Sequence, residues 1–181
     1  MSRLLEQYKA ETAKELAERF GHASLLAAPR LMKICLNSRV GEANKEQKML
    51  EEAVETLTLV SGQRAVPTKA KKSVAGFNLR KGYNVGCRVT LRGRMMYDFF
   101  DRLVNIAIPR IRDFTGMSRT SFDGGGNYSL GIDDPTIFPE VNPDNITYPM
   151  GMDITIVTSA KRDEEARALM ESLGFPFRRE D

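Results

Sequence analysis

Two segments of this chain alternate apolar and polar residues, and this alternation limits the fold more than any other feature of the sequence. In segment 31–40 the apolar positions are Met32, Ile34 and Leu36, and the polar ones are Lys33, Asn37 and Arg39. In segment 85–92 the apolar positions are Val85, Cys87, Val89 and Leu91, and the others are Gly86, Arg88, Thr90 and Arg92. Because successive side chains of a strand point to opposite faces, both segments predict strands of a sheet that is covered on one face and open on the other.

Segments with helical periodicity supply the cover that the apolar face requires. Helices are predicted over 2–20, from about Asn44 to Gly62, over 94–108, and in a last segment that closes at Gly174. In the second of these, Asn44 and Gln47 have the spacing of a capping box, and the apolar stripe comprises Leu50, Ala53, Val54 and Leu57. Further strands are predicted over 63–70, where Pro67 favours an edge or a bulge, over 127–132 and over 151–158.

This order of elements predicts an α+β fold: a single antiparallel-type mixed sheet with helices packed on one face, the other face open, and a long irregular lobe. A length of 181 residues suits one domain with a sizeable core. We therefore expect a single domain over 1–181 that carries a basic loop at 71–84 and an acidic, Gly- and Pro-rich lobe at about 109–150. A lobe of that length is usually functional or mobile.

Charge is divided along the chain into two blocks of opposite sign. From Thr56 to Tyr97 there is no Asp or Glu, and the cations are Arg64, Lys69, Lys71, Lys72, Arg80, Lys81, Arg88, Arg92 and Arg94. From Thr120 to Ala160 there is no Lys or Arg, and the acids are Asp123, Asp133, Asp134, Glu140, Asp144 and Asp153. Cations without nearby carboxylates suit phosphate neutralisation, because an adjacent acid would compete with the phosphate. The basic block predicts a nucleic-acid partner; a solvated charged surface is the plainer alternative.

Other classes of function find little support. The chain lacks an apolar run long enough to span a membrane, and acids interrupt its first residues, so we expect a cytoplasmic protein without membrane contact. Cys35 and Cys87 lack metal-site spacing, and Cys35 lies in an apolar run, so we expect both to be buried, reduced thiols. His22 is the only histidine, and the run 124–126 is not followed by the Lys-Ser/Thr of a phosphate loop. We expect neither enzymatic activity nor a cofactor or metal.

The polar strand faces also indicate the kind of nucleic acid. Lys81-Gly82-Tyr83 matches only the first places of the aromatic motif of an RNA-recognition motif, and the polar strand positions include no aromatic residue. This favours contacts to phosphates and 2′-hydroxyls of folded RNA over stacking on bases. The basic loop could reach a second RNA; a plain hairpin loop is the alternative interpretation.

Several ordered runs carry a family resemblance. They are TKAKKSVAGF (68–77), VTLRG (89–93), PRIRDF (109–114), SFDGGGNYS (121–129), IFPE (137–140), MDITI (152–156) and GFPFR (174–178). Together they resemble the bacterial large-subunit ribosomal protein five family, the 5S rRNA-binding proteins of the central protuberance. The resemblance spans nearly the whole chain.

This resemblance implies that the open sheet face binds 5S rRNA and that the basic loop contacts the elbow of the P-site tRNA. The family's rRNA contacts would fall on Asn37, Gln63, Thr90 and Arg92, and the charge pattern adds Lys33, Arg39, Lys69 and Arg88. The tRNA contacts would be Lys71, Lys72, Ser73, Val74, Ala75, Gly76, Phe77, Arg80 and Lys81.

The resemblance also implies that the lobe bridges to small-subunit ribosomal protein thirteen, a basic protein. The candidate bridge residues are Arg110, Arg112, Asp133, Asp134, Glu140 and Asp144. An acidic lobe complements a basic protein and repels RNA. Segments 133–135 and 142–145 depart from the often basic residues expected in the family, so single bridge contacts are not carried over. Neighbouring large-subunit RNA and proteins would be further partners.

Two hypotheses remain from different classes. One is a structural constituent of the large ribosomal subunit that helps to attach 5S rRNA. The other is a free-standing factor or chaperone for structured RNA. An RNA-modifying factor would need a catalytic acid or a cofactor pocket beside the basic face, and the lack of acids from Thr56 to Tyr97 counts against it.

Overall fold

The computed structural model describes residues 2–41, 47–148 and 150–178. Its helices are α1 (Arg3–Gln7), α2 (Ala13–Arg19), α3 (Gln47–Ser61), α4 (Gly93–Arg102) and α5 (Asp163–Ser172). Its strands are β1 (Leu31–Arg39), β2 (Val66–Lys69), β3 (Asn84–Leu91), β4 (Tyr128–Ile132) and β5 (Met152–Thr158). A π-helical turn, Tyr8–Thr12, joins α1 to α2, and another, Leu103–Ala107, extends α4. Each predicted helix and strand is present; Asn44 of the predicted capping box lies outside the described residues.

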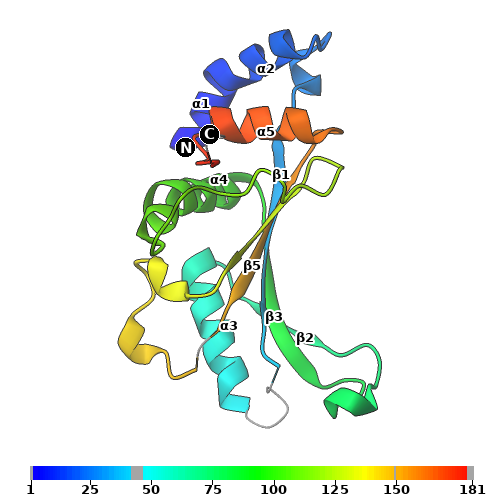
Figure 1. Ribbon diagram of the computed structural model, residues 1–181, viewed down its shortest axis with the longest axis vertical. Coiled ribbons are helices and arrows are strands. Elements are labelled where there is room, and N and C mark those ends of the chain that lie inside the picture. Colours follow the sequence, from blue (N-terminus) through cyan, green and yellow to red (C-terminus); the bar gives the residue numbers. More distant parts are fainter. Residues whose placement is uncertain (1, 42–46, 149, 179–181) are drawn as a thin grey trace. The chain divides into compact units, whose positions relative to one another are not determined.

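The strands form one antiparallel sheet, which confirms the predicted α+β class. Its order is β2-β3-β1-β5-β4, so β2 is an edge strand (Figure 1). An edge accommodates Pro67, because proline has no N–H to donate to a further strand. One detail of the alternation is wrong: Met32, expected on the apolar face with Ile34 and Leu36, is 40% exposed, whereas its neighbour Leu31 is buried.

The chain divides into two compact units, each assembled from separated segments. We call one the helical unit (Met1–Ile34, Arg92–Leu130 and Thr155–Asp181) and the other the hairpin unit (Cys35–Leu91 and Gly131–Ile154). Strands β1, β4 and β5 contribute residues to both units. We propose that the chain nevertheless unfolds as the single domain expected from its length, because separating the units would break three strands.

Aromatic side chains fill the core of the helical unit. The rings of Tyr128 and Phe175 meet edge to face, with their centroids 5.2 Å apart. The hydroxyl of Tyr128 donates to the carbonyl oxygen of Ser118 at 2.8 Å, so its polar end is satisfied. The hydroxyl of Tyr8 likewise donates to the carbonyl oxygen of Pro29 at 3.0 Å, and burial raises the pKa of Tyr8.

The glycine run of the helical unit forms a turn whose amides are bound by carboxylates of the protein itself. The amides of Gly124 and Gly126 donate to Asp163 at 3.2 and 2.9 Å. The amide of Gly125 donates to Asp123 at 2.9 Å. Hydrogen bonds to Asp123, first that from the Asn127 side chain, lower the pKa of Asp123. The amides that a bound phosphate would need are therefore already donors to carboxylates.

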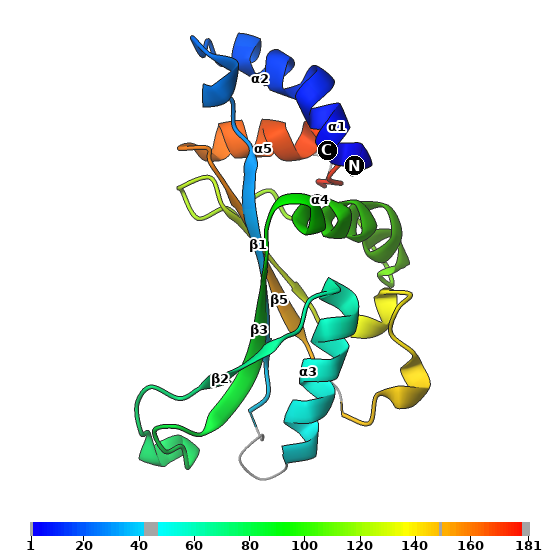
Figure 2. The same cartoon turned by 180° about the vertical axis from the view of Figure 1, so that it is seen from behind.

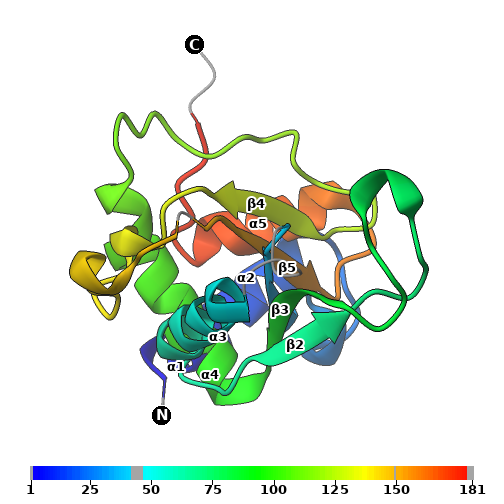
Figure 3. The same ribbon diagram turned by 90° about the horizontal axis from the view of Figure 1, so that it is seen from below.

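In the hairpin unit, α3 covers the apolar face of β3 (Figures 1 and 3). The buried residues of the helix are Leu50, Ala53, Thr56, Leu57, Val60 and Ser61. The buried residues of the strand include Cys87, Val89 and Leu91. Leu50, Ala53 and Leu57 of the predicted helical stripe and Cys87, Val89 and Leu91 of the predicted strand face are buried, whereas Val54 and Val85 are only half-buried.

Part of the predicted lobe belongs to the hairpin unit and is packed. Ile132, Ile137, Phe138 and Val141 are buried. The carboxylate of Glu52 on α3 accepts hydrogen bonds from the backbone amides of residues 147 and 148, at 2.8 and 3.1 Å. Segment 131–148 is therefore anchored to the helix by apolar burial and by a charge-assisted bond.

Replacement of Leu57 tests the role of α3. Leu57 is 1% exposed, and we expect Leu57→Ala to lower the free energy of unfolding by about 3 kcal/mol, because deletion of a buried Leu side chain leaves a cavity. Leu59, on the same helix, is 49% exposed, and Leu59→Ala should stay within about 0.5 kcal/mol of the wild type. Urea unfolding followed by circular dichroism measures both; equal losses would contradict this packing of the helix.

Candidate nucleic-acid interface

The open face of the hairpin unit is formed by β3 and β1. Arg88 and Thr90 of β3 are exposed, and on β1 Asn37 is half-buried and Arg39 exposed. The hydroxyl of Thr90 donates to Sγ of Cys35 at 4.0 Å. The two strands therefore present these side chains on the same face, as the alternation predicted.

Gln63 reaches this face from the loop between α3 and β2. Its side-chain Nε2 donates to the carbonyl oxygen of Thr90 at 3.5 Å. The hydroxyl of Ser61 fixes the backbone of Gln63 by accepting from its amide at 3.2 Å and donating to its carbonyl at 2.8 Å. The structure thus brings together Asn37, Gln63 and Thr90. Arg92, which is exposed, belongs to the helical unit, as does the half-buried Lys33.

A β-bulge changes the assignment of faces at the start of β3. The pairing of β2 with β3 slips between Thr68, opposite Gly86, and Lys69, opposite Asn84. Val85 is the extra residue, and it lines the open face. The prediction that Val85 lies on the apolar face was wrong, because an inserted residue reverses the alternation. Lys69 pairs with Asn84 and so points away from the open face.

Beyond β2 and β3 the chain continues as an ordered hairpin over 70–83 (Figure 2). The amide of Ala70 donates to the carbonyl of Tyr83 at 2.7 Å. Val74 and Leu79 exchange backbone hydrogen bonds of 2.9 and 3.1 Å. Phe77 lies at the tip and is 81% exposed. The predicted basic loop is therefore a β-hairpin that holds its side chains in defined positions.

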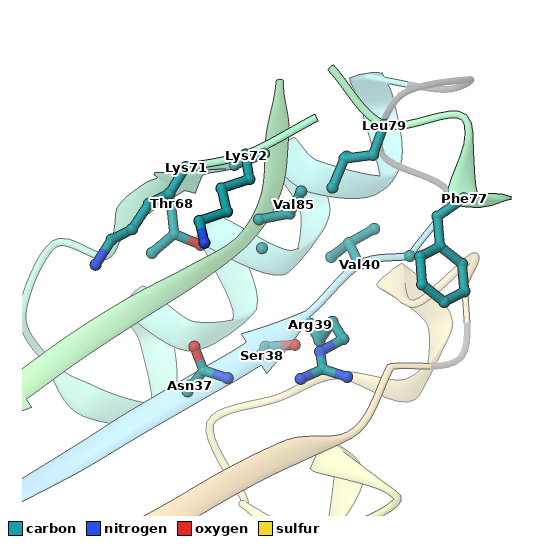
Figure 4. Close-up of a pocket in the computed structure, with 13 residues that line it drawn as sticks. Asn37, Ser38, Arg39, Val40, Thr68, Lys71, Lys72, Phe77, Leu79 and Val85 are labelled. Atoms are coloured by element: carbon teal, nitrogen blue, oxygen red, sulfur yellow. The ribbon is translucent and has the colours of Figure 1, made fainter. Parts of the chain in front are cut away.

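The hairpin and the open face enclose a groove of about 800 Å³ (Figure 4). Its lining residues are Asn37, Ser38, Arg39, Val40, Gly41, Thr68, Ala70, Lys71, Lys72, Phe77, Leu79, Val85 and Gly86. Figure 4 shows Lys72 on one side, Arg39 on the other and Phe77 at one end. Residues assigned from the sequence to two different RNAs thus line one groove.

Close packing of β3 against β1 requires glycine at position 86. A Cβ at Gly86 would lie 2.4 Å from the carbonyl oxygen of Ser38 and 3.2 Å from Cα of Arg39. Both atoms belong to the backbone, so they cannot move aside as a flexible side chain would.

The other side of the hairpin carries a second hollow, of about 680 Å³. Its lining residues are Ser73, Ala75, Asn78, Leu79, Arg80 and Tyr83. The hydroxyl of Ser73 accepts from the amide of Lys81 at 3.0 Å, which fixes this part of the hairpin. The hairpin therefore presents cations on two sides: Lys71 and Lys72 line the groove, and Arg80 lines the second hollow.

The cations and the acids of the hairpin unit lie on different elements. In the described part of the chain, no carboxylate forms an ion pair with Arg39, Lys72 or Arg88. The acids of α3, including the exposed Glu51 and Glu55, lie on the helix that covers the opposite face of the sheet. The cations of the open face are therefore available to an anionic partner.

The candidate bridge residues fall in both units. Arg110 and Arg112 are exposed in the helical unit. Asp133, Asp134 and Asp144 are exposed in the hairpin unit, where Glu140 is half-buried. The carboxylate of Asp134 also accepts from the amide and hydroxyl of Thr136, at 2.8 and 2.7 Å, and so caps a short 3-10 turn.

Among residues 2–41, 47–148 and 150–178, no helix is long and apolar enough to cross a membrane. The same residues include no group of three His, Cys, Asp or Glu side chains arranged to hold a metal ion. Sequence reasoning missed the apolar floor of the groove, formed by Val40, Leu79 and Val85. No local signal marks these residues, because the hairpin and β1 are distant in sequence.

Comparisons with family models and with individual known proteins all indicate the same family. The model of the ribosomal protein L5 family matches residues 25–80, and that of the ribosomal L5P family C-terminus matches residues 84–177. The large ribosomal subunit protein uL5 of Marinomonas sp. (strain MWYL1) is 52% identical over 179 residues, 99% of this chain and 100% of the relative. The protein of the same name from Geobacter sulfurreducens is 53% identical over 178 residues, 98% of this chain and 99% of the relative.

The two cysteines should differ in reactivity and so test the open face. Burial raises the pKa of Cys87 to about 11 and leaves its thiol without access to solvent. The prediction that both thiols are buried holds for Cys87 but was wrong for Cys35, which is half-buried because it lies on the open face beside Thr90. We expect a maleimide at neutral pH to label Cys35 in the folded protein and Cys87 only after unfolding, because the thiolate is the reactive form. Mass spectrometry of the labelled peptides measures this; labelling of both at equal rates in the folded protein would contradict the structure.

Proposed function

The chain belongs to the ribosomal protein uL5 family and is a structural, non-enzymatic constituent of the large ribosomal subunit, and from this membership we propose that its open sheet face binds 5S rRNA. The observation that carries the proposal is the face itself. Asn37, Gln63 and Thr90 supply amide and hydroxyl groups, and Arg39 and Arg88 supply charge without a carboxylate partner among the described residues. Such a set suits phosphates and 2′-hydroxyls of folded RNA. Lys33 and Arg92, which belong to the helical unit, and Lys69, which points away from the open face, are proposed as separate rRNA contacts.

A second proposed contact is between the hairpin tip and the P-site tRNA. The tip residues Ser73, Val74, Ala75 and Gly76 are exposed, and Arg80 and Lys81 add charge. The backbone hydrogen bonds of the hairpin support this role, because an ordered projection loses little conformational entropy when it binds. The second hollow, which Arg80 and Tyr83 line, supports this contact, because it shares only Leu79 with the groove.

A third proposed contact is between the lobe and small-subunit ribosomal protein thirteen. Asp133, Asp134 and Asp144 are exposed, and the segment from Thr120 to Ala160 has no cation. Such a surface attracts a basic protein and repels RNA. Arg110 and Arg112, which are exposed in the helical unit, are proposed as further bridge contacts.

The 5S proposal is tested by binding of the purified protein to 5S rRNA and to an unrelated folded RNA of equal length, over a salt series. We expect the 5S complex to persist at physiological salt while the control complex is lost, because non-specific binding depends mainly on counterion release. Equal binding to both RNAs that disappears with salt would leave a basic protein without a defined RNA and would overturn the proposal.

Replacement of a single cation on the open face makes this test more specific. Arg88→Met should weaken 5S binding about tenfold, the effect of losing ~1.5 kcal/mol from a charge-assisted hydrogen bond. The salt slope, meaning the steepness with which the logarithm of the binding constant falls with the logarithm of salt concentration, should decrease by about one if Arg88 contacts a phosphate. Lys161→Met removes an exposed cation from the helical unit and is the control. If Arg88→Met binds 5S rRNA with the affinity and the salt dependence of the wild type, Arg88 does not belong to the interface.

The tRNA contact is tested on the side of the hairpin that carries Arg80. The double variant Arg80→Met, Lys81→Met should leave the affinity for 5S rRNA within about twofold of the wild type, since neither residue lines the groove. Ribosomes that carry the variant should release P-site tRNA faster, because two cations near its phosphates are lost. Dissociation of labelled tRNA measures the rate. An unchanged tRNA rate with a large loss of 5S affinity would reverse the assignment of this side of the hairpin.

A further inference from the structure

The groove beside the hairpin has a floor that a phosphate backbone alone does not need. Val40, Leu79 and Val85 form its apolar part, and the ring of Phe77 stands at one end (Figure 4). Phosphates and 2′-hydroxyls are recognised by charged and hydrogen-bonding groups, so a surface that contacts only these is polar throughout. The apolar floor therefore indicates a ligand with an aromatic or apolar part as well as a negative one.

The walls of the groove supply the complementary charge. The amine of Lys72 points into the groove, and the guanidinium of Arg39 lies on the opposite wall (Figure 4). Asn37 and Thr68 add an amide and a hydroxyl. An apolar floor with cations on both walls matches a nucleotide, which combines a flat base with a phosphate.

We infer that this groove binds one unpaired nucleotide of an RNA, with its base against Phe77 and the apolar floor and its phosphate between Lys72 and Arg39. The inference rests on the proposed function, because it takes RNA as the partner of the open face. Bases of unpaired RNA stack on aromatic side chains while cations follow the backbone. The groove volume of about 800 Å³ lies within the usual range of small-ligand sites, ~300–1,000 Å³.

This inference revises the expectation that the interface makes no stacking contact. The strands of the open face carry no aromatic residue at their polar positions, but the hairpin folds Phe77 to the end of the groove. Phe77 is 81% exposed, so its ring contributes little to the core and is free to stack. Lys71 and Lys72, assigned from the sequence to tRNA, line the groove and would serve the RNA on the open face.

The position of the groove favours a nucleotide within a strand over a free one. Asn37 and Arg39 belong both to the groove and to the open face. The nucleotides that flank a bound base would therefore meet Arg88 and Thr90, and their phosphates would add charge contacts. A free mononucleotide would leave these groups unused.

The test compares an RNA hairpin that has an unpaired loop with the blunt duplex of the same stem, and uses 5S rRNA as a third probe. Phe77→Leu keeps an apolar side chain but removes the ring, and should weaken binding of the looped hairpin and of 5S rRNA about tenfold while leaving the duplex unchanged. Its salt slope should equal that of the wild type, because no charge is removed. Lys72→Met should lower the slope by about one.

Phe20→Leu is the matched control, because Phe20 is a half-buried aromatic residue at the end of α2, in the helical unit, and lines neither hollow of the hairpin. It should bind all three RNAs as the wild type does. Adenosine monophosphate and uridine monophosphate should compete only at millimolar concentrations, since a free nucleotide lacks the flanking contacts.

The outcomes separate this inference from the proposed function. Wild-type affinity for 5S rRNA and for the looped hairpin in both Phe77→Leu and Lys72→Met would overturn the inference and leave 5S binding intact. Binding of the looped hairpin that depends on Phe77, without preference for 5S rRNA, would support the inference and overturn the proposed function. Tight competition by a free mononucleotide would overturn the assignment to an RNA strand.

Discussion

The hairpin unit depends on the burial of one face of its sheet by α3. Leu57 and Val60 of the helix and Val89 and Leu91 of β3 lose contact with water together, and burial of each such side chain contributes ~1.5–3 kcal/mol. Because a strand alternates, burial of these residues leaves Arg88 and Thr90 no position except the opposite face. The location of the open face is thus fixed by apolar packing, before any RNA is considered.

Burial on one side also decides where charge can lie. A cation under α3 would lose its hydration without a partner, which costs several kcal/mol, so Arg88 is stable only on the open face. The acids of α3, such as Glu51 and Glu55, are exposed on the helix that covers the opposite face of the sheet. The same packing that forms the core therefore separates cations from anions, and this separation is what a phosphate-binding surface needs.

The parts of the fold that depend on local pattern could be predicted from the sequence. Strand β3 and helix α3 were found from periods of two and 3.6 residues, and Asn37 and Thr90 were placed on one face for the same reason. Val85 could not be placed, because the bulge opposite Thr68 and Lys69 results from pairing between strands. The groove was missed for a related reason: Phe77 and Arg39 are distant in sequence, and only the folded chain brings both to its lining.

The hairpin shows how a basic segment can be ordered without acids. An ion pair would fix Lys72 or Arg80, but it would also occupy the charge that a phosphate must meet, and an exposed pair contributes only ~0–1 kcal/mol. The hairpin instead uses the backbone bonds between Ala70 and Tyr83 and between Val74 and Leu79, which do not involve the cations. Order and charge are therefore supplied by different residues of the same hairpin. A side chain such as Lys72 can be positioned at the groove by the backbone bonds of its neighbours and still offer its whole charge to RNA.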